Sequence, residues 1–390
     1  MRLLAIALGR PKGGDALREW RSRPEFAERM AFAEPCAMTS AAPAFPWQRW
    51  SNSTVESAGA DLVLSNPDLV VRCADPLNCE VRLSRLAHVA VTPNDRFYVR
   101  NHFPVPAIDA DRWRLRVSGH VTDSLDFSLP ELRHMPAQTL TVTLECAGNG
   151  RSMFNPPIDG EPWGLGAVST AEWTGVALSE ILDRADVQPN ASHLVFRGAD
   201  GFERGLGLET PVLLAYEMNG LPMAANHGYP LRAIVPGWYA VAGVKWLVEV
   251  EVTDRPFDGY YQVERYVYDR DTPVTRMHVR SLVTAPEEGA RVKLGDLTIE
   301  GLAWSGSNPI ARVDVSVGDG DWLEANLLGQ PNLYAWQRWQ LITRIDRPGS
   351  ILIRSRATDS SGATQPPEAE WNRLGYGNNS IQTVTFRARL

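Results

Sequence analysis

The chain has 390 residues, of which 44% are hydrophobic and 22% are charged. This is a globular composition, and it excludes a collagen-like, coiled-coil or wholly disordered chain. The formal net charge is −7, with 36 arginines and 3 lysines, so we expect no basic surface for phosphate backbones and no nucleic-acid partner. The longest apolar run near the N-terminus, residues 3–8, is too short for a signal-peptide core or a bilayer span, so no membrane association is expected.

The N-terminal residues carry little periodic pattern. Residues 1–50 are predicted to be an extension, with a helical candidate over 15–32 followed by an Ala/Pro/Trp stretch. Residues 51–95 are polar and interrupted by prolines, which predicts a segment that wraps a surface and builds no core.

From residue 51 to residue 275 we predict one α+β domain, because strands and helices mix after residue 96 without a regular βαβ rhythm. Asn219-Gly220 is a strong signal for a two-residue hairpin turn. Ser128 and Glu131 have the spacing of a helix-capping box. The remaining elements expected here are strands over 113–117, 139–144 and 244–252 and an amphipathic helix over 176–185.

From residue 276 to residue 390 the pattern changes to short strands separated by turn signals, with no convincing helix. This predicts an Ig-like β-sandwich. The expected fold class is therefore α+β, a mixed domain followed by a sandwich. The chain has no phosphate loop and no G-x-G-x-x-G motif, so a nucleotide-binding function is not supported.

Cys146 stands at the carboxyl end of the alternating strand predicted over 139–144, before a turn of small residues and Arg151. Three interpretations of this thiol are open. The thiol could be a buried structural residue, or a nucleophile with His102 or His227 as its general base. The third interpretation is a ligand to a soft metal, which needs no base. The cysteine spacing fits no usual zinc site, and no C-x-x-C-H motif is present for a covalently attached haem.

Four segments resemble, in order and spacing, the molybdopterin domain of the sulfite oxidase family: 97–106, 141–151, 227–232 and 243–246. Further segments, 301–306, 312–316 and Trp371-Asn372, resemble the C-terminal dimerisation domain of that family. The resemblance covers about residues 80–390, and its motifs together are highly specific.

The resemblance implies a molybdenum–molybdopterin cofactor (Mo-MPT), with Cys146 as the only protein ligand to molybdenum. No haem is expected, because the sequence shows no haem domain or haem motif. It implies that the cofactor is also bound by residues of the matching motifs: Tyr98, Val99, Arg100, Asn101, His102, Asp200, His227, Arg232, Gly243, Val244 and Lys245. It further implies a substrate pocket of Arg100, Arg151 and Trp163, and a catalytic Tyr266 whose hydroxyl shuttles a proton.

The sequence also departs from the family pattern. In the motif 334–339, Gln337 stands where animal-type members have an arginine, and Arg338 is one position away. If strand alternation holds, Arg338 points to the other face. Gly150 replaces a common basic residue. These departures predict a less cationic pocket, which bears on the substrate more than on the cofactor.

The expected function is a molybdenum oxidoreductase of sulfur metabolism that oxidises sulfite to sulfate by oxygen-atom transfer. Electrons are expected to pass to an external acceptor, a cytochrome c-like carrier or oxygen. The alternatives are sulfane-sulfur oxidation, nitrate or sulfoxide reduction and, in a different class, a cofactor-free binding module on the same fold. A homodimer is expected. The expected compartment is the cytoplasm; the alternatives are the peroxisome, because Ala388-Arg389-Leu390 resembles a targeting tripeptide, and the periplasm if translation starts elsewhere.

Overall fold

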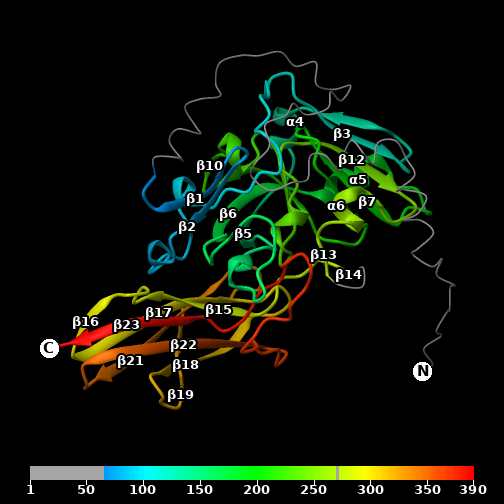
Figure 1. Ribbon diagram of the computed structural model, residues 1–390. Coiled ribbons are helices and arrows are strands. Elements are labelled where there is room, and N and C mark those ends of the chain that lie inside the picture. Colours follow the sequence, from blue (N-terminus) through cyan, green and yellow to red (C-terminus); the bar gives the residue numbers. More distant parts are fainter. Residues whose placement is uncertain (1–65, 269–271) are drawn as a thin grey trace, which may run out of the picture. The chain divides into compact units, whose positions relative to one another are not determined.

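The computed structural model describes residues 66–268 and 272–390 (Figure 1). The predicted N-terminal extension and its helical candidate lie outside the described residues. Where helices are described, none has the length and apolar character needed to cross a membrane. All described residues belong to one compact unit.

The described chain begins with a hairpin of β1 (Leu69–Ala74) and β2 (Leu77–Val81). All five residues of β2 are buried, and Cys79 exchanges two 2.9 Å backbone hydrogen bonds with Val99. The prediction that residues 51–95 build no core is therefore wrong for this hairpin. The sequence gives no strand signal here, because β2 is buried on both faces and so lacks the hydrophobic–polar alternation of a half-exposed strand.

One five-stranded antiparallel sheet carries the predicted cysteine strand. It contains β5 (Ala137–Glu145), β6 (Val168–Ala177), β9 (Leu213–Met218), β10 (Leu221–Pro222) and β11 (Arg232–Ile234). The strand predicted over 139–144 is confirmed, and the last four residues of β5 are buried. The hairpin at Asn219-Gly220 is also confirmed, since both residues have positive φ and join β9 to β10.

A second sheet has five strands. In spatial order they are β4 (Leu125–Phe127), β3 (Leu115–Gly119), β12 (Leu247–Thr253), β7 (His193–Gly198) and β8 (Glu203–Gly207). The strand predicted from residue 244 begins only at Leu247. Residues 244–246 instead turn towards the pocket described below, and Trp246 has a φ of 50°.

Few helices accompany these sheets. The capping box of Ser128 and Glu131 is confirmed at the start of α4 (Leu129–Arg133), and the amphipathic helix is α5 (Leu178–Ala185). A short helix α6 (Tyr260–Val263) precedes β13 (Val267–Tyr268), which pairs with β14 (Thr272–Pro273). Single 3-10 turns cover Leu83–Arg85, Asn94–Arg96, Arg151–Met153, Ala225–His227 and Ala240–Ala242.

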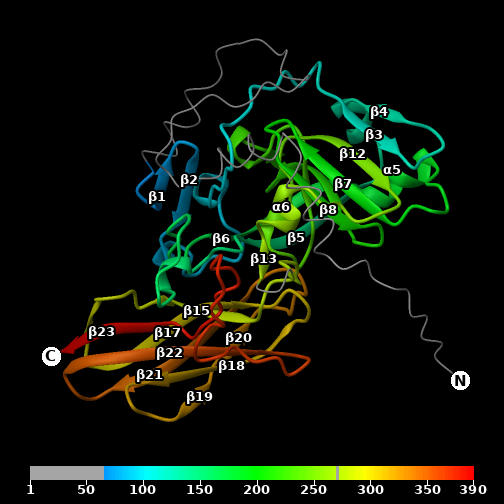
Figure 2. The ribbon, with the colours of Figure 1, turned by 45° about the vertical axis from the view of Figure 1, so that its right-hand side comes forward.

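The C-terminal residues form two sheets around their own apolar core, and residues 276–390 contain no helix. Figure 2 shows these strands coloured from yellow to red. The first sheet is β15 (Arg280–Ala285), β17 (Gly295–Trp304), β21 (Gln337–Ile345) and β20 (Asn326–Leu328). The second is β16 (Arg291–Lys293), β23 (Thr383–Arg389), β22 (Gly349–Asp359), β18 (Ile310–Val317) and β19 (Trp322–Glu324). The predicted fold class, α+β followed by a β-sandwich, is confirmed.

The sandwich contacts β5 directly. The backbone N–H of Thr143 donates to Tyr334 O at 2.8 Å, and its hydroxyl accepts the Trp336 N–H at 2.8 Å. Arg280, the first residue of β15, forms an ion pair with Glu145, the last residue of β5. The strand that leads to Cys146 is therefore held by both halves of the described chain.

Candidate active site

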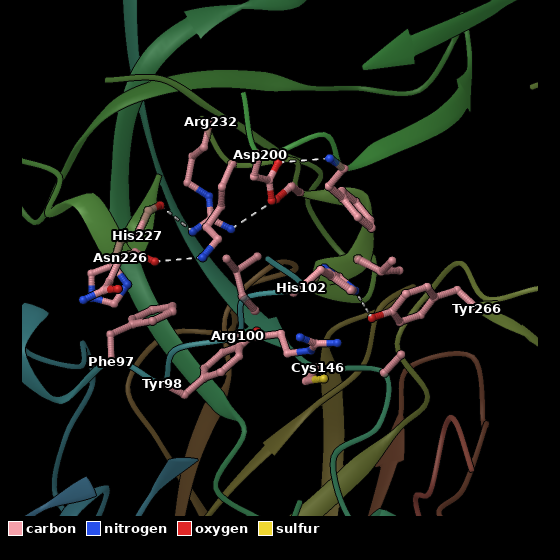
Figure 3. A pocket seen from close by; sticks show the side chains of 17 residues that line it. Phe97, Tyr98, Arg100, His102, Cys146, Asp200, Asn226, His227, Arg232 and Tyr266 are labelled. Atoms are coloured by element: carbon pink, nitrogen blue, oxygen red, sulfur yellow. Dashed lines mark hydrogen bonds between the residues drawn. The ribbon is translucent and has the colours of Figure 1, made fainter. Parts of the chain in front are cut away.

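A pocket of about 630 Å³, including its mouth, lies at the end of β5 (Figure 3). Figure 3 shows Cys146 and Arg100 at one end, with Arg232 and Asp200 at the other. The side chains around it come from six stretches of chain that lie far apart in the sequence. They are Phe97, Tyr98, Arg100, His102, Leu144, Cys146, Ala147, Asp200, Phe202, Asn226, His227, Arg232, Ala240, Val241, Gly243, Lys245 and Tyr266.

Cys146 is held in a tight turn at the end of its strand. Its N–H donates to Ala167 O, and its carbonyl accepts the Asn149 N–H, both at 2.9 Å. The guanidinium of Arg151 packs against Gly148, where a Cβ would lie 2.7 Å from its Nη1. Burial raises the pKa of the Cys146 thiol, while the positive charges of Arg100 and Arg151 oppose this rise. A cation such as a metal would favour the thiolate further.

Positive charge dominates the other end of the pocket. Lys245 donates to Asn101 Oδ1 and, at 2.9 Å, to Asn226 O. Burial and the nearby Arg232 guanidinium lower the pKa of the Lys245 ammonium well below its usual value, and Asp200 opposes this shift. Buried cations are costly unless an anion pairs with them. Because Asp200 is the only carboxylate among the described residues that line the pocket, an anionic ligand is expected here.

Arg232 and Asp200 show the effect of burial on this pocket. Nη1 of Arg232 donates to His227 O at 2.9 Å, but its Nε has no partner among the described residues. Burial lowers the pKa of Arg232 to about 10 and raises the pKa of the Asp200 carboxyl to about 6. The unused donor of Arg232, which lines the pocket, is a group that a bound anion would satisfy.

The residues present fit Mo-MPT. Its phosphate wants cationic and amide donors, which Arg232 and Lys245 supply, and its pterin edge offers donors that Asp200 can accept. A soft metal wants a thiolate, which Cys146 supplies. Within 66–268 and 272–390 no group of three or more His, Cys, Asp or Glu side chains could hold a metal ion.

A hydrogen-bonded pair flanks the cysteine end. Nε2 of His102 lies 2.6 Å from the hydroxyl of Tyr266, and the imidazole stacks on Phe202 with centroids 4.4 Å apart. Burial and the charges of Arg100 and Lys245 lower the pKa of His102 well below its usual range, so the imidazole is neutral. Burial raises the pKa of Tyr266, so its hydroxyl keeps its proton, and the pair shares one hydrogen bond whose direction is set by the tautomer of the imidazole.

Comparison with known proteins agrees with this chemistry. Residues 102–261 match the oxidoreductase molybdopterin-binding domain, and residues 271–388 match the Mo-co oxidoreductase dimerisation domain. The chain is 36% identical over 348 residues to sulfite oxidase of Gallus gallus, a match that covers 80% of this chain and 76% of that protein.

The chain belongs to the sulfite oxidase family.

Two other relatives show the range of that family. Nitrate reductase [NADH] 1 of Oryza sativa is 32% identical, and the match covers 80% of this chain but only 40% of that protein. The crystal structure of the sulfane dehydrogenase SoxCD from Paracoccus pantotrophus aligns with a TM-score of 0.73 at 27% identity, covering 89% of this chain and 93% of that chain. Family membership alone therefore leaves the substrate to be decided by the site.

The structure brings together most of the residues that the family motifs predict. Ten line the pocket: Tyr98, Arg100, His102, Cys146, Asp200, His227, Arg232, Gly243, Lys245 and Tyr266. Val99, Asn101 and Val244 lie beside lining residues in the chain but do not line the pocket themselves. Sequence reasoning missed Phe97, Leu144, Ala147, Phe202, Asn226, Ala240 and Val241. Asn226 could have been found as the neighbour of His227, whereas the apolar residues carry no chemical signal.

Arg151 and Trp163 lie outside the lining. Nε and Nη1 of Arg151 donate to Leu374 O and Glu161 O, both at 3.1 Å. Its Nη2 has no hydrogen-bond partner among the described residues. Trp163 is fully buried, and its Nε1 also lacks a partner there. Arg151 thus keeps one donor for an anion and is close enough to lower the pKa of Cys146.

Gln337, one of the departures from the family pattern, does not itself line the pocket. It is the first residue of β21, and its Nε2 donates to Leu328 O on the neighbouring strand β20. Its amide is therefore bonded within the sandwich. That the missing arginine makes the pocket less cationic stays a prediction. The sandwich reaches the Cys146 turn through residues 371–378 instead.

Proposed function

We propose that this protein oxidises sulfite: sulfite and water give sulfate, two protons and two electrons. Bound Mo-MPT would supply the oxygen-atom transfer and take up the two electrons. The chain would hold the metal through Cys146 and the rest of the cofactor through the cations Arg232 and Lys245 and the carboxylate of Asp200. The homology to sulfite oxidases supports sulfite as the substrate.

The observation that carries the proposal is the set of unused arginine donors near the thiol. Arg100 lines the pocket beside Cys146, and its Nη1 donates to Asn101 O and, at 3.4 Å, to Asn78 Oδ1. Among the described residues its Nε and Nη2 have no partner, and neither does Nη2 of Arg151. Forked guanidinium donors suit a small oxyanion such as sulfite, which carries oxygens on one side and a sulfur lone pair on the other.

Tyr266 and His102 provide a route for a proton. The Tyr266 hydroxyl lies in the pocket, 2.6 Å from Nε2 of the neutral His102 imidazole, so a proton lost near Cys146 can be relayed through this pair. The route needs no charged side chain in its resting state. Oxidation of sulfite by water releases two protons, and a positioned acceptor removes them from the anion site.

The electrons would leave to an external acceptor, a cytochrome c-like carrier or oxygen. The dimerisation domain supports a homodimer. A second candidate function is sulfane-sulfur oxidation, which the similarity to SoxCD over 89% of this chain favours. Both reactions oxidise sulfur, but a sulfane substrate depends less on arginine donors than sulfite does.

The test is a comparison of kcat/KM for sulfite, thiosulfate, nitrate and a sulfoxide on molybdenum-loaded protein, with ferricyanide or viologen as the electron partner. We expect sulfite to give the highest value. Arg100→Gln should lower the sulfite value by about 10- to 150-fold, because a charge-assisted hydrogen bond contributes about 1.5–3 kcal/mol. Arg114→Gln, which alters an exposed arginine, should leave it unchanged. A higher value for another substrate, or an Arg100→Gln variant with wild-type sulfite kinetics, would contradict the proposal.

A further inference from the structure

The connection between β22 and β23 contains a tightly folded loop, residues 371–378. Oδ1 of Asn372 accepts the Tyr376 N–H at 3.0 Å, and its Nδ2 donates to Tyr376 O at 2.8 Å. Gly375 and Gly377 have φ values of 65° and 67°. The amide of Asn372 thus closes the loop, and the glycines allow its left-handed turns.

This loop is bonded to the turn that carries Cys146. Nε of Arg151 donates to Leu374 O at 3.1 Å, and the Gly377 N–H donates to Ala147 O at 2.8 Å. Nδ2 of Asn378 donates to Gly150 O at 2.9 Å. Three hydrogen bonds therefore connect the loop 371–378 to residues 147–151, on the chain directly after the thiol.

The ring of Tyr376 lies between two residues of the site. It stacks on the ring of Tyr266, with centroids 4.9 Å apart and planes 19° apart. Cζ of Arg151 lies 5.1 Å from the centroid of the same ring. Tyr376 is 6% exposed, so the water that would weaken both contacts is largely excluded.

We propose that Tyr376 is a positioning residue that sets the affinity for the anionic substrate. One aromatic ring fixes the plane of Tyr266, whose hydroxyl lines the pocket, and the guanidinium of Arg151, whose Nη2 is unused. The sandwich thereby contributes to the site without lining the pocket itself. This inference rests on the proposed oxidation of sulfite, because a neutral substrate would gain little from a fixed Arg151.

The test compares Tyr376→Leu, which removes the ring, with Tyr376→Phe, which keeps it. A freed Arg151 should raise the KM for sulfite about tenfold in Tyr376→Leu, within the range expected for a partly desolvated cation–π contact. Tyr376→Phe should restore the KM to within about twofold of wild type. The matched control is Trp336→Phe. Trp336 also lies between the two halves, with its Nε1 donating to Ala90 O at 2.9 Å, and among the described residues no hydrogen bond, ring stacking or cation–π contact links it to Tyr266 or Arg151.

Separate values of KM and kcat distinguish a residue that positions Arg151 from a residue that only stabilises the fold. A residue that only stabilises the fold would lower the fraction of active enzyme, and so kcat, and leave KM unchanged. An unchanged KM in Tyr376→Leu, or an equal rise in Tyr376→Phe, would overturn the inference. If Tyr376→Leu does not fold, Tyr376→Met takes its place, because it also removes the ring while filling more of the buried space, and it should likewise raise KM.

A second readout does not depend on turnover. Crystal structures of the wild type and Tyr376→Phe should show the same planes for Tyr266 and Arg151, and Tyr376→Leu should show both side chains displaced. Unmoved side chains in Tyr376→Leu would overturn the inference even if sulfite is the substrate. Absence of sulfite oxidation by the wild type would instead contradict the proposed function, and the structures would still decide the role of Tyr376.

Discussion

Nη1 of Arg280 lies 2.7 Å from Oε1 of Glu145, and each side chain is 1% exposed. The second carboxylate oxygen of Glu145 accepts Nε1 of Trp304 at 2.9 Å, and Asn149 Nδ2 donates to the first at 3.0 Å. Glu145 directly precedes Cys146, while Arg280 and Trp304 belong to the sandwich. A buried, fully bonded carboxylate therefore connects the two halves beside the candidate metal ligand.

Removing the arginine should expose how much the structure depends on this pair. Arg280→Met leaves a buried carboxylate unpaired, and we expect the free energy of unfolding to fall by about 3–5 kcal/mol. The double variant Glu145→Gln/Arg280→Met should recover part of this loss, because the unpaired charge is gone. Urea unfolding monitored by tryptophan fluorescence measures both. The control Arg344→Met removes an exposed ion-pair partner and should cost at most about 1 kcal/mol. A similar small cost in Arg280→Met would contradict the account.

The buried histidine of the pocket should make stability depend on pH. Burial lowers the pKa of His227 to about 3, while the N–H bond to Asn94 O opposes this shift. The unfolded chain, with a pKa of about 6.5, therefore binds more protons between these values, and folding stability is lost as the pH falls below about 6.5.

The expected slope is about 1.4 kcal/mol of unfolding free energy per pH unit between pH 6 and pH 4, over and above other groups. His227→Gln should lack this component, whereas His134→Gln, at an exposed histidine, should retain it. The measurement is urea unfolding across this pH range. Parallel curves for the wild type and His227→Gln would show that His227 does not titrate in this way.

Lys245 should matter for holding the cofactor. Lys245→Met removes a buried cation that contacts Asn101 and Asn226, so the affinity for Mo-MPT should fall by about 10- to 150-fold, the value of one charge-assisted hydrogen bond. Pterin content after gel filtration, read by fluorescence of the oxidised pterin, measures the loss. Lys293→Met, at an exposed lysine of β16, is the matched control. Equal pterin content in both variants would remove Lys245 from the cofactor site.

Tyr266 should act on turnover more than on binding. Tyr266→Phe keeps the ring stacked on Tyr376 but removes the hydroxyl bonded to His102, so we expect kcat for sulfite to fall by about 100-fold with a smaller change in KM. Tyr268→Phe is the control, because it removes a nearby tyrosine hydroxyl that does not line the pocket. A wild-type kcat in Tyr266→Phe would exclude the proton route through His102.

Local chemistry made part of the fold and site predictable. The alternation of β5 placed Cys146 at a strand end, and the dipeptide Asn219-Gly220 gave the hairpin turn, because both signals act within a few residues. The family motifs likewise supplied ten residues that line the pocket. Strand β2 was not predicted, because burial on both faces removes the alternation of hydrophobic and polar residues that marks a half-exposed strand.

The role of the sandwich in the site could not be predicted from the sequence. Gln337 is fixed by its neighbour strand β20, whereas Tyr376 reaches Tyr266 across more than a hundred residues of chain. Such a contact depends on how the loop 371–378 is anchored to residues 147–151. No local pattern encodes that anchoring, so only the tertiary structure reveals it.

The most direct test of the central claim is an anaerobic single turnover with sulfite and no electron acceptor. Molybdenum-loaded wild-type protein should form about one sulfate per bound molybdenum, together with a change in visible absorption, because the metal can take up two electrons. Cys146→Ser should fold but form none, since a hydroxyl is a harder and far less acidic ligand than a thiol. Cys79→Ala, which alters the other buried free cysteine, should behave as wild type. No sulfate from the wild type, or equal sulfate from Cys146→Ser, would contradict the account.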